Sequence, residues 1–184
     1  HAPLLDGTRL SMEGIALTGA WVDLEEGLLA VIVLEIGASS RLCAFLRPGE
    51  PVVAMGPTGA PSEVPQGETV LLAGGGLGNA VLFSLAKALR EAGNKVIYFA
   101  GYRKPEDLFH REDIEAGTDQ VVWSGDRGEP IVPKRPIDRA FGGNIVQAMV
   151  SYARGELGEV LYPLSTVDRL VAIGSDKMMA AVGR

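Results

Sequence analysis

The chain has 184 residues, enough for one well-buried domain or for a small domain with part of a second. Its net charge of −6, with no cluster of Lys and Arg among aromatic residues, argues against nucleic acid as a partner. Hydrophobic residues make up 47% of the chain, but every apolar run is far shorter than the roughly 20 residues that span a membrane. We therefore expect a soluble, globular protein without a membrane partner.

The first third is predicted to be strand-like, because residues 28–35 and 52–55 are rich in β-branched and aliphatic side chains. Residues 56–67 then combine prolines, which lack a backbone donor, with glycines, so neither a helix nor an interior strand is expected there. We place the boundary between two domains in this segment, with a first domain at 1–65 and a second at 66–184.

The second domain alternates between strands and helices. Asn79 is expected to cap the first helix and Gly93 to end it. This alternation predicts an α/β fold, a Rossmann-like parallel sheet flanked by helices, with ligands at the carboxyl ends of the strands. The predicted strands are 70–73, 95–100, 120–123 and 169–173, and the predicted helices are 79–92, 105–114, 144–154 and 177–182.

Residues that ligate metals are few. Cys43 is the only cysteine, and His1 and His110 are the only histidines, so no zinc or iron–sulfur ligand set exists. Cys43 fits a reducing cytoplasm and is predicted to be a buried structural thiol in preference to a reactive one. His110 stands among charges, which favours a solvated loop or helix-end residue over a catalytic base. The start at His1, without methionine or targeting segment, suggests an excised fragment and is compatible with a tag remnant.

A glycine-rich loop follows the first strand of the second domain, where Gly74, Gly75, Gly76 and Gly78 precede the predicted helix. Glycines let the backbone approach a pyrophosphate, and the free N–H groups of a helix start attract its charge. Asn79 breaks the G-x-G-x-x-G spacing, and glycine after a strand is also an ordinary way to turn a chain. We nevertheless predict that this loop holds the phosphates of a dinucleotide.

The second strand does not end in an acidic residue, although an ordinary NAD-binding Rossmann unit offers one to the ribose hydroxyls. Methyltransferases that bind S-adenosylmethionine usually need an acid at the same place, so its absence also counts against that class. The strand runs instead into Gly101, Tyr102, Arg103 and Lys104. Arg103 and Lys104 can meet a phosphate or stack on an adenine, and the alternative is two solvated loop charges. At the end of the last strand, Gly174 would likewise let a flat ring or a phosphate come close.

The order of these motifs resembles the ferredoxin-NADP reductase superfamily over about residues 14–184. More closely, it resembles the branch with the electron-transfer subunit of dihydroorotate dehydrogenase, the sulfhydrogenase gamma subunit and the small subunit of electron-bifurcating ferredoxin:NADP oxidoreductase. The matching phrases are L-R-P-G-E at 46–50, G-P-T-G at 56–59, the glycine loop, Gly101 with Arg103, and G-S-D-K-M at 174–178. The resemblance implies part of a flavin-binding β-barrel before an NAD(P)-binding domain.

The resemblance also implies which residues hold cofactors, while no catalytic residue and no metal ligand is assigned. Gly37, Ser39 and Ser40 look like the family's loop for the FAD pyrophosphate, although a plain turn before a helix fits the same letters. The last segment would border the nicotinamide. The residues expected to hold NAD(P) are Gly74, Gly75, Gly76, Leu77, Gly78, Asn79, Tyr102, Arg103, Asp126, Gly174, Ser175, Asp176 and Met178.

Three departures from the family's pattern concern redox chemistry. The R-x-[YF]-[ST] phrase that grips flavin would lie before Gly14 and is missing, so the flavin half is truncated or flavin has been lost. Ile173 and Ser175 replace a cysteine and a proline of the last segment. The cysteine cluster that ligates [2Fe–2S] is absent.

We therefore expect an NAD(P)H-binding module of a cytoplasmic, flavin-dependent oxidoreductase. Hydride would pass between nicotinamide and FAD, and electrons would continue to a redox partner subunit or domain. The alternative is a non-catalytic nucleotide-sensing or interaction module that has lost flavin. Arg103 and Lys104 lean toward NADPH, but resembling proteins of either preference share the turn. The sequence leaves open whether the chain forms a homo-oligomer.

Overall fold

The computed structural model describes residues 14–183, so His1 and the segment before Gly14 lie outside the described residues. The chain divides into two compact units whose boundary falls between Pro61 and Ser62. This boundary lies inside the segment rich in proline and glycine, which has neither helix nor strand up to residue 67. The two units are therefore described separately.

In the first unit, strands β1 (Gly19–Asp23) and β2 (Leu28–Val31) form an antiparallel hairpin. Helix α1 (Ala38–Leu42) and the 3-10 helix η1 (Cys43–Phe45) follow. The strand predicted at 28–35 is shorter than expected, because β1 pairs with it only as far as Val31. The flavin barrel that the resemblance implies stays a prediction.

Two predictions for the first unit are wrong. Residues 52–55 do not form a strand, since Val53 and Met55 are 83% and 90% exposed and no strand of the described chain pairs with them. Pro51 and Pro57 flank the segment and lack the N–H donors that a strand ladder needs. Cys43 is half-buried rather than buried, because η1 buries none of its residues.

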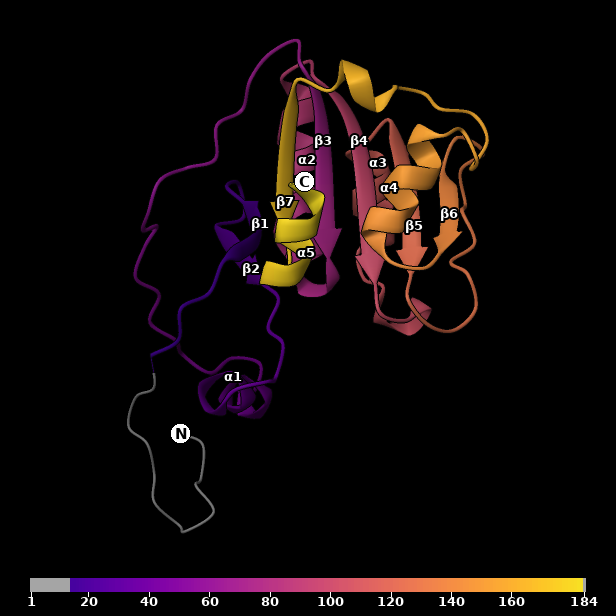
Figure 1. Ribbon diagram of the computed structural model, residues 1–184. Helices are drawn as coiled ribbons and strands as arrows, with labels where there is room; N and C mark the ends of the chain where they lie inside the picture. Colours follow the sequence, from indigo (N-terminus) through magenta and orange to yellow (C-terminus); the bar gives the residue numbers. More distant parts are fainter. Residues whose placement is uncertain (1–13, 184) are drawn as a thin grey trace. The chain divides into compact units, whose positions relative to one another are not determined.

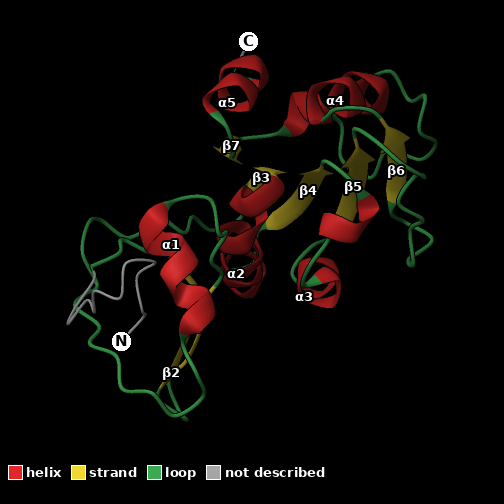
Figure 2. Cartoon of the chain, turned by 90° about the horizontal axis from the view of Figure 1, so that it is seen from below, coloured by secondary structure: helices red, strands yellow, loops and turns green. Residues whose placement is uncertain are grey.

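The second unit is a three-layer α/β structure (Figures 1 and 2). Its five strands are parallel and follow the order β6-β5-β4-β3-β7. Helices α2 (Asn79–Glu91) and α3 (Arg111–Ala116) cover one face, and α4 (Ile145–Ala153) and α5 (Asp176–Val182) cover the other. The predicted α/β fold is confirmed. The strands are β3 (Thr69–Gly75), β4 (Lys95–Tyr102), β5 (Gln120–Gly125), β6 (Arg139–Gly142) and β7 (Arg169–Ile173).

Two elements of this unit differ from the sequence-based expectation. The helix predicted at 105–114 is split into the 3-10 helix η3 (Pro105–Asp107) and α3, because His110 has a φ of 48° and begins α3 anew. β6 was not predicted, since it is a four-residue edge strand that is only half-buried. Within residues 14–183, no helix is long and apolar enough to cross a membrane.

Three aspartates join the amino ends of neighbouring strands. Each aspartate lies directly before one strand and accepts a hydrogen bond from a backbone N–H of the adjacent strand in the sheet. These carboxylates satisfy donors that the sheet would otherwise leave without a partner at its edge. The three hydrogen bonds run from Thr69 N to Asp168 Oδ2 (2.8 Å), from Val96 N to Asp119 Oδ2 (2.7 Å) and from Val121 N to Asp138 Oδ1 (2.8 Å). They fix the start of each strand relative to the next.

We predict that Asp138→Ala lowers the free energy of unfolding by about 2–3 kcal/mol, as measured by urea denaturation. Asp138 is buried and also accepts hydrogen bonds from Arg135 Nε at 2.8 Å and Nη2 at 2.7 Å, so the substitution leaves three donor groups without their acceptor. Glu112→Ala is the control, because it removes an exposed carboxylate paired with Lys134 and should leave the midpoint almost unchanged. Equal losses for the two variants would contradict the role given to Asp138.

Candidate functional site

The residues expected to hold NAD(P) lie at the carboxyl edge of the second unit's sheet, because all five strands point the same way (Figure 1). β3 ends at Gly75, β4 at Tyr102, β5 at Gly125 and β7 at Ile173. The chain order reverses between β3 and β7, and α2 and α5 begin close after these two strands. Ligands of such sheets bind at this kind of switch point.

Gly76 begins the 3-10 helix η2 (Gly76–Gly78) and faces open space. Its φ is 55°, and no atom lies within 4 Å of the position that a Cβ would occupy. A left-handed conformation costs other residues about 1–2 kcal/mol, so glycine is favoured here by the backbone itself. Gly76 and the exposed Leu77 are therefore the part of the loop that a ligand can approach directly.

Asn79 is fully buried and does not cap α2 as predicted; Gly78 is the N-cap, with no side-chain hydrogen bond. The reason is that the Asn79 amide is engaged elsewhere. Its Nδ2 donates to the carbonyl oxygens of Gly76 at 2.9 Å and Gly101 at 3.3 Å. Its Oδ1 accepts a hydrogen bond from the Tyr98 hydroxyl at 2.8 Å. Sequence reasoning missed Tyr98, whose only signal was a hydroxyl in an apolar strand.

At the junction between β3 and β7, a Cβ added at three of the glycines would come closer than 3.0 Å to another atom. A Cβ at Gly75 would lie 2.5 Å from the Met178 sulfur, and one at Gly174 would collide with the same sulfur. A Cβ at Gly78 would collide with the Ile173 carbonyl. Packing against the backbone therefore requires a glycine at position 78, whether or not a ligand is present, whereas a Cβ at Gly75 or Gly174 would require the Met178 side chain to shift.

The start of α5 brings the remaining residues of the last segment to this junction. Ser175 is the N-cap, and its Oγ accepts a hydrogen bond from Met178 N at 3.3 Å. Asp176 is exposed in the first turn. The structure thus places Gly174, Ser175, Asp176 and Met178 beside the glycine loop, with Gly75 in direct contact.

The turns after β4 and β5 lie together. Asp126 N donates to the Tyr102 carbonyl at 3.2 Å, and Arg127 N donates to the Arg103 carbonyl at 3.0 Å. Arg103, Lys104 and Asp126 are exposed. Tyr102 itself is only 3% exposed, because its ring is turned into the core. It packs edge-on against Phe109 and stacks on Trp123, with ring centroids 5.9 and 6.5 Å away.

The residues expected to hold FAD lie in the first unit, at the start of α1. Gly37 is the N-cap, and Ser39 and Ser40 lie in the helix. The Ser40 hydroxyl accepts a hydrogen bond from Gly37 N at 2.9 Å and donates one to Gly37 O at 3.2 Å. The turn is therefore closed by its own side chain.

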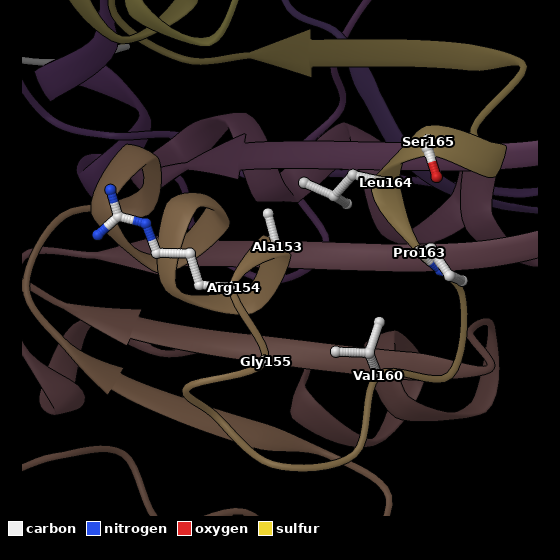
Figure 3. A pocket seen from close by; sticks show the side chains of 7 residues that line it. All are labelled: Ala153, Arg154, Gly155, Val160, Pro163, Leu164 and Ser165. Carbon is white, nitrogen blue, oxygen red and sulfur yellow. The ribbon is translucent and has the colours of Figure 1, made fainter.

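A cavity of about 510 Å³ lies at the opposite, amino edge of the sheet, between the end of α4 and the 3-10 helix η4 (Leu164–Thr166) (Figure 3). Its lining is mostly apolar, and Arg154 is the charged residue in it. Within the second unit, the cavity thus lies at the edge opposite to the residues expected to hold NAD(P). Its lining residues are Ala153, Arg154, Gly155, Val160, Pro163, Leu164 and Ser165.

Known proteins are similar to parts of this chain. An uncharacterised protein of Rickettsia prowazekii is 43% identical over 93 residues, which are 50% of this chain and 13% of that protein. A dihydroorotate dehydrogenase B (NAD(+)) electron transfer subunit homolog of Thermotoga maritima is 35% identical over 115 residues, 62% of this chain and 41% of that protein. The corresponding subunit of Enterococcus faecalis is 29% identical over 145 residues, 76% of this chain and 51% of its own length. No protein-family model matches the chain.

Among solved structures, an NADH-dependent reduced ferredoxin-NADP oxidoreductase, described for flavin-based electron bifurcation, is 33% identical with a TM-score of 0.57. The match covers 67% of this chain and 49% of that chain. These findings confirm the resemblance to the ferredoxin-NADP reductase superfamily and to the branch named above, with a ferredoxin reductase-like fold. The chain spans about half or less of the length of these relatives.

We predict that Gly78→Ala lowers the free energy of unfolding by about 3 kcal/mol, because the added methyl group meets the Ile173 carbonyl. Gly76→Ala should cost only about 1–2 kcal/mol, because its methyl group points into open space and only the left-handed backbone is penalised. Urea denaturation of both variants checks this order. A larger loss for Gly76→Ala would contradict the distinction between packing glycines and the open glycine.

Proposed function

We propose that this chain is the NAD(P)H-binding module of a flavin-dependent oxidoreductase. The observation that carries the proposal is the open, left-handed Gly76 at the start of η2, which leads directly into α2 at the switch point of a parallel sheet. The N–H groups of a helix start attract a pyrophosphate, and Gly76 leaves the space for one. The names of the relatives, which include NAD(+) and electron transfer, support the same class of function.

The roles proposed for individual residues follow from their positions. Gly76, Leu77 and the first turn of α2 would hold the pyrophosphate, and the exposed Arg103 would hold the adenosine end. Gly174, Ser175, Asp176 and Met178 would border the nicotinamide. Tyr102 would contribute its backbone, since its ring is buried. The chain binds and orients, while hydride exchange with flavin is the chemistry that the cofactors supply when bound.

The flavin side of the proposal rests on the first unit. Residues 1–65 would be part of an FAD-binding barrel, with Gly37, Ser39 and Ser40 near its pyrophosphate. An FAD pyrophosphate would have to compete with the hydrogen bonds that Ser40 makes to Gly37. A redox partner subunit or domain would take the electrons onward, in the cytoplasm, and a homo-oligomer is compatible with this arrangement.

We expect Gly76→Asp to bind NADH about tenfold more weakly than Gly76→Asn, as measured by titration calorimetry. Asn and Asp have nearly the same size, and both tolerate a left-handed backbone, so the pair isolates the effect of a negative charge beside the phosphates. The difference should shrink at high salt. NADPH titrated in parallel measures the nicotinamide preference. Equal affinities of the two variants would refute the phosphate role of the loop.

A non-catalytic nucleotide sensor is the second candidate, favoured by the Ser40 hydroxyl, which closes the turn at Gly37 with its own hydrogen bonds. A visible absorption spectrum of the purified full-length protein separates the two functions. We expect the two visible bands of an oxidised flavin, which bleach when NADH or NADPH is added. A colourless full-length protein that still binds NAD(P) would overturn the enzyme and establish the sensor.

A further inference from the structure

We propose that Asn79 and Tyr98 form a buried positioning pair that sets the shape of the glycine loop before any ligand binds. The inference rests on the proposed function, because the loop's ligand is taken to be a dinucleotide pyrophosphate. Neither side chain is given a contact with that ligand: both are fully buried, Asn79 in the first turn of α2 and Tyr98 in the middle of β4.

The pair connects the two loops that meet at the carboxyl edge. Asn79 Nδ2 donates to Gly76 O, which belongs to the loop after β3, and to Gly101 O, which lies near the end of β4. Gly76 O also receives the backbone N–H of Asn79. One amide therefore holds the segment proposed for the pyrophosphate and the segment that leads to Arg103.

The direction of these bonds matters for an anionic ligand. A phosphate is attracted by N–H groups and repelled by carbonyl oxygens. Because Asn79 binds the Gly76 carbonyl oxygen with both its backbone N–H and its Nδ2, this oxygen is already engaged within the protein. The neighbouring N–H groups of the loop are then the polar groups that remain for the phosphates.

The two carbonyls only accept and therefore require Nδ2, and Tyr98 supports this orientation of the Asn79 amide by donating to Oδ1. Burial, together with the nearby Tyr102, raises the pKa of Tyr98 well above its ordinary value, so its hydroxyl stays protonated and donates to Oδ1. Nδ2 is then left for Gly76 and Gly101. The same arrangement explains why residue 74 is a glycine, since a Cβ at this position would collide with Asn79 Oδ1 and lie 3.0 Å from the Tyr98 hydroxyl.

The chain contains a matched control for Tyr98→Phe. Tyr152 is also fully buried, and its hydroxyl also donates to a side-chain amide oxygen, Gln120 Oε1, at 2.6 Å. It lies in α4, on the other face of the sheet, and its hydroxyl also lies 3.1 Å from Tyr162 O and accepts a hydrogen bond from Tyr162 N at 3.4 Å. Tyr152→Phe should therefore lose at least as much stability as Tyr98→Phe, and only Tyr98→Phe should change the glycine loop.

The experiment measures the affinity of both variants for ADP and NADH by calorimetry, and the hydrogen–deuterium exchange of residues 74–80 without ligand. We expect Tyr98→Phe to bind about fivefold more weakly and its loop to exchange faster, with Tyr152→Phe within about twofold of the wild type. Asn79→Asp, which keeps the acceptor for Tyr98 but loses both donors, should weaken binding further.

Two outcomes distinguish the inference from the proposed function. If the wild type binds neither ADP nor NADH, the proposed function fails, and the exchange of residues 74–80 alone still decides whether the pair shapes the loop. If the wild type binds but Tyr98→Phe and Tyr152→Phe change affinity and exchange equally, the positioning role is overturned and the function stands.

Discussion

The second unit depends on the parallel pairing of β3 with β4 on one side and with β7 on the other. A strand paired on both edges and covered on both faces cannot carry charged side chains, and β3 is buried along almost its entire length. Parallel pairing also brings the carboxyl ends of four segments to one edge, although the chain places them up to about a hundred residues apart. The candidate site is a consequence of this pairing.

Four of the glycines at this edge have a steric explanation that is independent of any ligand. Gly74 makes room for an amide, Gly75 and Gly174 for a sulfur, and Gly78 for a carbonyl. A glycine-rich loop in a sequence therefore reports close packing as readily as ligand binding. Gly76 differs, because a Cβ there would meet open space and its backbone is left-handed. Packing therefore does not explain this glycine, and its open position is the part of the loop that a ligand can approach.

The sequence predicted those parts of the fold in which burial imposes a pattern. β3, β4, β5 and β7 are apolar runs, and α2 has an apolar face, so their existence and their places along the chain were predicted correctly. β6 and the split between η3 and α3 were missed, because a half-buried edge strand and one left-handed residue leave no periodic signal. For the site, the sequence indicated which residues would converge but not how Asn79 is used, since its partners lie 3, 19 and 22 residues away.

The aspartates at the amino edge have a consequence for how motion is distributed in the sheet. They tie strand starts that are 17, 23 and 99 residues apart in the chain, so this edge opens only when distant segments separate together. The opposite edge ends in turns, several of them glycine-rich and exposed. We therefore expect the amino edge to open only with the whole sheet, whereas the turns of the carboxyl edge can adjust locally, in the pairs that the contacts between neighbouring turns define.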